Sequence, residues 1–129
     1  MLITSIPQYV QGITNAKVDL TNTNDTVLYT APSDADFNAS IVNSILVSND
    51  SGSADTITVT LVSGSDTFSL FKLEEVGAVS SKELLLKDLI LQSGEIIKVQ
   101  AATGARLHVV ASIQEITKQR ITTSALANI

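Results

Sequence analysis

The chain contains no cysteine and no tryptophan, and its single histidine is His108. Without cysteine it can form neither a disulfide framework nor a thiolate metal site. One histidine cannot build a multi-histidine metal centre, and the sequence has no His-Glu-x-x-His pair, nucleophile elbow or Walker-type lysine loop. These absences predict a protein that is not an enzyme and that has no catalytic residue, no metal and no cofactor.

Aromatic side chains are scarce as well, since three Phe and two Tyr are the only ones present. Sugars and single-stranded bases usually stack on aromatic rings, so carbohydrate binding loses support. Phe68 and Phe71 lie three residues apart on an expected strand and should face opposite sides. Two interpretations stay open: one ring fills the core while the other covers an edge, or one ring lies at an interface.

Charged residues are missing from the first sixteen positions, and residues 117–129 hold only Lys118 and Arg120. The segment between them, 17–116, carries six basic and thirteen acidic side chains, a formal charge of −7. Such a balance offers no basic surface for phosphate, so we expect no nucleic-acid partner. No stretch approaches the roughly 20 apolar residues of a membrane helix, and no secretory signal is evident, so we expect a soluble protein with no membrane partner.

What the sequence does contain is a regular succession of turns and β-forming segments. Clusters rich in Asn, Asp, Ser and Gly alternate with segments rich in Val, Ile, Thr and Leu, which is typical of an antiparallel sandwich. We predict an all-β, jelly-roll-like β-sandwich of seven or eight strands, at residues 26–30, 41–48, 56–61, 66–73, 80–86, 96–101 and 106–113, with the eighth at 17–20. The leucine-rich stretch 81–91 would also suit a short helix.

Two segments show the alternation of a half-buried strand most clearly. In the first, Ile57, Val59 and Leu61 share one face and threonines share the other. In the second, the residues predicted to point into the core are Leu107, Val109, Ala111 and Ile113. His108 should then point outward. Composition alone does not exclude a Ser-His-Asp triad, but a strand histidine between apolar neighbours is most often an ordinary surface residue.

The loop 49–55 is rich in oxygen ligands of the kind that calcium prefers. It lacks the ordered spacing of a calcium loop, and a hairpin connection rich in turn formers is the favoured interpretation. Glu74 and Glu75 form a carboxylate pair in sequence, but adjacent strand residues point to opposite faces and are not expected to share a proton.

Both ends of the chain differ from the middle. We predict an N-terminal arm at 1–16, a sandwich domain at 17–116 and a C-terminal arm or tail at 117–129. The uncharged N-terminal segment carries apolar residues that need a surface to cover, and the C-terminal segment ends on an apolar tip. The residues that we expect to make these contacts are Leu2, Ile3, Ile6, Tyr9, Val10, Ile13, Leu126 and Ile129. For the C-terminal segment, simple terminal disorder is an equally supported interpretation.

The sequence from 26 to 113 carries a characteristic series of strand and turn motifs: Val27-Leu28-Tyr29-Thr30-Ala31-Pro32, the strand 41–49 with its Ser51-Gly52-Ser53-Ala54 turn, the strand 56–61, and the approach 89–95 to the strand 96–101. This series resembles a small β-sandwich of accessory virion proteins of tailed bacteriophages, found in decoration or cement proteins and in neck and tail parts. Residues 72–88 depart from the pattern. The resemblance implies a non-enzymatic structural role and supplies no catalytic residues.

Together these observations predict a virion structural protein, made in the host cytoplasm, that forms a symmetric homo-oligomer, with a trimer favoured. It would attach to the major capsid protein, or to neck or tail proteins, through its arms and loops. Capsid decoration or cement is favoured over a neck or tail adaptor or a fibre-associated component. The alternatives are a glycan- or receptor-binding module that presents loops 22–25 and 49–55, and a hydrolase that uses His108.

Overall fold

The computed structural model describes the backbone of residues 5–122 and the side chains of residues 12–118. Within these residues it contains nine strands and no helix. The strands are β1 (Ser5–Leu20), β2 (Thr26–Thr30), β3 (Phe37–Asn49), β4 (Asp55–Ser63), β5 (Asp66–Val76), β6 (Ser80–Glu83), β7 (Leu89–Leu91), β8 (Ile96–Ala101) and β9 (Leu107–Thr122).

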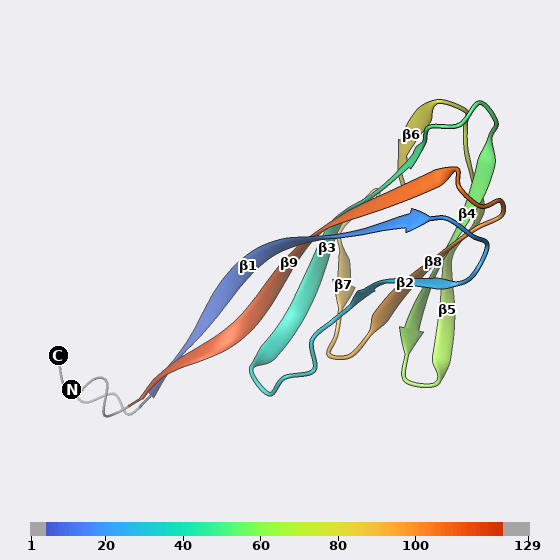
Figure 1. Ribbon diagram of the computed structural model, residues 1–129. Helices are drawn as coiled ribbons and strands as arrows, with labels where there is room; N and C mark the ends of the chain where they lie inside the picture. The colour runs from blue at the N-terminus through green and yellow to red at the C-terminus, as the bar shows by residue number, and fades with distance from the viewer. Residues whose placement is uncertain (1–4, 123–129) are drawn as a thin grey trace.

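The strands form two antiparallel sheets that face each other (Figure 1). One sheet has the order β1-β9-β3-β6, with β7 also paired to β3, and the other has the order β2-β8-β4-β5. With the short β7 set aside, this is the winding of an eight-stranded jelly roll. The predicted fold class is confirmed, and β7 is the strand beyond the expected eight.

Side chains that alternate along the strands fill the space between the sheets. Ile57 and Val59 of β4 are fully buried, and Leu61 is partly buried against the same core. The four residues predicted to point inward from β9 are all buried: Leu107, Val109, Ala111 and Ile113. Burial of each such aliphatic side chain contributes roughly 1.5–3 kcal/mol, so this core is the main source of stability.

The turns follow the sequence with one correction. Gly64, at φ 62°, stands in the two-residue turn that joins β4 to β5, where Ser63 pairs with Asp66. The loop 49–55 was expected to close a hairpin, and that expectation is wrong. It connects β3 of one sheet to β4 of the other. Periodicity and turn residues do not distinguish a hairpin from a crossing between layers.

The leucine-rich stretch after residue 80 forms two short strands instead of one long strand or a helix. β6 ends at Glu83, whose carboxylate accepts hydrogen bonds from the N–H groups of Ile45 (2.8 Å) and Leu85 (3.1 Å) and from the hydroxyl of Ser44. Leu84 then enters the core and Leu86 is exposed. The carboxylate takes the place of a continuing strand beside β3, which explains why β6 stops there.

Candidate interaction surface

The most distinctive feature of the molecule is a long two-stranded ribbon made by its first and last strands. β1 and β9 pair without a register shift from Ser5 with Thr122 to Leu20 with Leu107. β3 pairs with β9 only as far as Thr117, so the pairs from Ser5 to Tyr9 have no third strand beside them. Figure 1 shows the two strands leaving the body of the sandwich together.

The sequence predicts an N-terminal arm at 1–16 and a C-terminal arm or tail at 117–129. The structure pairs their described parts, 5–16 and 117–122, with β9 and β1 of the same chain. Of the predicted contact residues, Ile6, Tyr9 and Val10 lie on β1 at positions where only the backbone is described. Ile13 is 84 % exposed. Four of them lie outside the described residues: Leu2, Ile3, Leu126 and Ile129.

The outer face of the β1-containing sheet carries a row of three isoleucines and one glutamine across four strands at the base of the ribbon. The register places Ile13 of β1 beside Gln114 of β9, Gln114 beside Ile41 of β3, and Ile41 beside Ile90 of β7. Ile90 is 62 % exposed, and Ile41 is half-buried. Ile13 was predicted as a contact residue, whereas Ile41 and Ile90 were not, because they join Ile13 through strand pairing that a local sequence pattern does not contain.

A polar cluster joins the two sheets at the same end of the sandwich. The hydroxyl of Tyr29 on β2 donates to the carboxylate of Glu115 on β9, and the buried Ser40 on β3 lies 2.7 Å from the Tyr29 oxygen. Burial, together with the hydrogen bond and negative charge of Glu115, raises the pKa of Tyr29 to about 12. The cluster fixes β9 at the point where it leaves the core, since Ile113 is its last fully buried residue.

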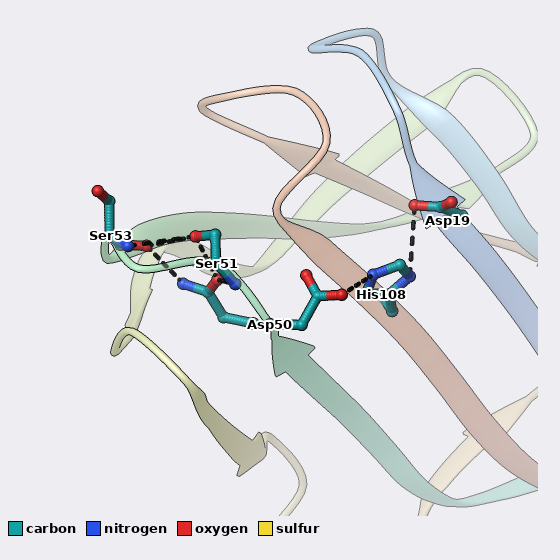
Figure 2. Close-up of polar contacts among 6 residues, drawn as sticks. Asp19, Asp50, Ser51, Ser53 and His108 are labelled. Carbon is teal, nitrogen blue, oxygen red and sulfur yellow. Dashed lines mark hydrogen bonds and ion pairs between the residues drawn. The ribbon is translucent and has the colours of Figure 1, made fainter.

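The opposite end of β9 carries His108, which is partly exposed on the outer face, as predicted. Figure 2 shows it between two carboxylates: Nδ1 lies 3.3 Å from Asp19 of β1, and Nε2 lies 3.3 Å from Asp50 after β3. In a Ser-His-Asp triad one ring nitrogen must receive the serine proton. Here both nitrogens face carboxylates, so the imidazole bridges Asp19 and Asp50, and the arrangement differs from a nucleophile-activating triad.

The neighbouring loop 49–55 is organised by the side chain of Asn49. Its Oδ1 accepts from the N–H and the hydroxyl of Ser51, and its Nδ2 donates to the carbonyl oxygens of Ser53 and Val76. The hydrogen bonds of the Asn49 amide thus stabilise the turn. Within the described part of the chain, no group of three or more His, Cys, Asp or Glu side chains is placed to hold a metal ion.

Phe71 packs against the core, whereas Phe68 is 53 % exposed on β5. The expectation that the two rings face opposite sides is wrong, because a register shift lies between them: Phe71 pairs with Val59 and Phe68 with Leu61, and both partners point toward the core. Among residues 5–122, no helix is long and apolar enough to cross a membrane.

The sequence matches no protein-family profile and no curated protein sequence. Its fold is similar to several solved structures. A chain from the acidic stable capsid of Helicobacter pylori bacteriophage KHP30 aligns with a TM-score of 0.55 at 12 % identity, over 90 % of this chain and 98 % of that one. A chain from the Bacillus endospore appendages, a family of disulfide-linked pili, aligns with a TM-score of 0.53 at 13 % identity, over 91 % and 96 %. A pentameric capsid protein from metagenomic phage sequences aligns with a TM-score of 0.48 at 18 % identity, over 88 % and 65 %. At these identities the first two alignments, whose TM-scores exceed 0.5, show a similarity of fold alone.

Proposed function

We propose that this protein is a non-enzymatic structural subunit of a bacteriophage virion, which forms homo-oligomers and attaches to the particle through the β1–β9 ribbon and the surface at its base. The observation that carries the proposal is the ribbon itself. A two-stranded ribbon is at best marginally stable in water, because it has no second layer to cover it. A partner surface would supply that layer.

The similarity to a phage capsid chain supports the same conclusion, because it extends over nearly the full length of both chains. The chemistry of the described residues adds to it: the one histidine is bridged between Asp19 and Asp50, and Asn49 is occupied in holding a turn. Within the virion we favour a capsid decoration or cement role over a neck or tail position, and a trimer as the oligomer.

The test combines solution mass with binding to particles. Light scattering after size-exclusion chromatography should give a homo-oligomer, and the purified protein should co-sediment with phage particles that lack it. Images of those particles should show added density on the shell for a decoration protein, and at the portal or tail for an adaptor. A stable monomer that binds no part of the particle would refute the proposal.

A second candidate is a subunit of an extended fibre, favoured by the similarity to the Bacillus endospore appendage chain. The absence of cysteine means that a fibre of this chain would not be disulfide-linked. Electron microscopy of the concentrated protein distinguishes the two, because a fibre subunit should form filaments without particles and a decoration protein should form closed oligomers.

A further inference from the structure

One long edge of the sandwich carries no neighbouring strand. β1 is the outermost strand of its sheet, and among the described residues it pairs only with β9. The exposed residues Gly12, Ile13, Thr14 and Asn15 show that neither face of this part of β1 is covered. An edge of this kind presents a row of unpaired backbone N–H and C=O groups to any strand that can approach it.

The structure identifies which backbone groups face this free edge. The carbonyl oxygen of Leu20 accepts from the N–H of Ala105 at 2.8 Å, on the β9 side. Because the β1–β9 register has no shift and strand residues alternate in direction, even-numbered residues of β1 face β9 and odd-numbered residues face outward. On β9, the N–H of Lys118 bonds to Asp36 on the β3 side, so its register partner Tyr9 also faces outward.

Pro7 agrees with this assignment. Proline is accepted in a sheet where its missing N–H would face away from the neighbouring strand, and residue 7 is odd-numbered. It removes one donor at the outer end of the edge. The donors that face outward in the segment after Pro7 and before Lys17 are the N–H groups of Tyr9, Gln11, Ile13 and Asn15.

The other edges of the two sheets carry features that hinder strand addition, whereas β1 does not. β5 holds four charged residues after its turn (Asp66, Lys72, Glu74 and Glu75), and its pairing with β4 has two register shifts. β2 has five residues and one register shift, and β6 and β7 have four and three residues. β1 has sixteen residues and no charged residue before Lys17. Charges, irregularity and shortness are the usual protections of an edge strand.

We propose that the outer edge of β1, from Tyr9 to Asn15, pairs with an edge strand of a second copy of this chain. A second copy supplies a strand that fits, because it carries the same long and regular edge, and contact between these edges places no acidic residue in the paired segments, since all thirteen acidic residues lie from Asp19 to Glu115. The inference rests on the proposed homo-oligomer and names the backbone that would make it.

The alternation along β1, in which odd-numbered residues direct their N–H groups to the free edge, provides a direct test. In Asn15→Pro, the lost N–H belongs to the free edge and the hydrogen bonds to β9 are kept, so the monomer should fold. Asn15→Ala is the matched control, because it changes the side chain and retains the N–H. Sedimentation equilibrium should show the dissociation constant of the oligomer raised about tenfold or more in Asn15→Pro and nearly unchanged in Asn15→Ala.

A second variant covers the case in which proline perturbs the strand itself. Asn15→Lys adds a charge to the edge strand and keeps the N–H, and it should also weaken association, because a charged side chain would lie beside the added strand. Circular dichroism and thermal unfolding of each variant establish that the fold is retained.

The outcomes separate this inference from the proposed function. If wild type is oligomeric and both Asn15→Pro and Asn15→Lys associate as tightly as wild type, the β1 edge is not the interface, although the homo-oligomer stands. If wild type is monomeric yet binds particles, the edge pairing is refuted and a virion role stands. A dimer that the Asn15→Pro change dissociates supports the inference and means that β1 pairs with β1 about a twofold axis. A ring, such as a trimer, that this change dissociates also places the β1 edge in the interface, and it would show that the charges or shortness of another edge do not prevent pairing with β1.

Discussion

Tyr29 is the residue that joins the two sheets by polar contacts at the base of the ribbon. Its hydroxyl donates a hydrogen bond to the carboxylate of Glu115, and the buried hydroxyl of Ser40 is hydrogen-bonded to the Tyr29 oxygen. Tyr29→Phe should therefore lower the free energy of unfolding by about 1–2 kcal/mol, because it leaves a buried hydroxyl and a carboxylate with fewer partners. Urea unfolding at pH 7 measures this loss, and Tyr29→Phe combined with Ser40→Ala should cost less than the sum of the two single changes.

Wild type and the Tyr29→Phe variant also test the pKa of Tyr29. A pKa raised to about 12 from the ordinary value of 10.0 means that the folded state holds the proton more tightly than the unfolded chain. The resulting stability is fully present below pH 10 and is lost as the pH rises toward 12. The stability difference between wild type and Tyr29→Phe should thus shrink across this range. A constant difference would contradict the assignment.

Glu83 behaves in the opposite sense. Partial burial opposes its ionisation, but the hydrogen bonds from Ser44 and from the backbone of Leu85 and Ile45 outweigh it and lower its pKa below 4.5. Its contribution is present above pH 4.5 and is lost as the pH falls through the lowered pKa. Glu83→Gln should cost about 1 kcal/mol at pH 7, with a smaller cost at pH 3, as measured by urea unfolding at both pH values.

At the scale of elements, the turn between β8 and β9 depends on a close approach to the end of β1. A Cβ added at Gly104 would lie 2.7 Å from the carbonyl oxygen of Thr21, which is backbone and cannot move aside easily. Gly104→Ala should therefore lower stability by about 1–3 kcal/mol in thermal or urea unfolding. Gly52→Ala is the matched control, because nothing lies within 4 Å of its added Cβ, and its effect should stay within about 0.5 kcal/mol.

The elements themselves were largely predictable, because their periodicity is local. The strand at Thr26–Thr30 and the strand at Ile96–Ala101 match the expected bounds, and the inward residues of β9 were identified correctly. A local sequence pattern does not show which strands pair with each other. The hairpin expected at 49–55 is a crossing between sheets, and the extension of β1 to Ser5 depends on its pairing with β9, a partner about a hundred residues away.

The candidate surface was predictable only in part for the same reason. The uncharged start of the chain marked Ile13 as a contact residue, and the structure exposes it. Ile90 and Ile41 join it through strand register, and Asp19 and Asp50 meet His108 through the ends of two strands. The pattern of a single sequence carries no information on such non-local neighbours.

At the scale of the whole molecule, charge is separated between an acidic body and an uncharged β1 edge, and this separation predicts how salt acts on assembly. Repulsion between bodies of formal charge −7 opposes association, and salt screens it, with a Debye length of about 10 Å at 0.1 M. If copies join through the edge of β1, sedimentation equilibrium should show association strengthening several-fold from about 0.05 M to about 0.5 M NaCl. If they joined instead by docking Lys118 and Arg120 on the acidic body of a neighbour, the same increase in salt would weaken association. The Asn15→Pro variant, measured in parallel, gives the salt dependence of association without the β1 edge contact. The sign of the wild-type salt dependence then distinguishes an interface of neutral backbone groups from an ionic interface.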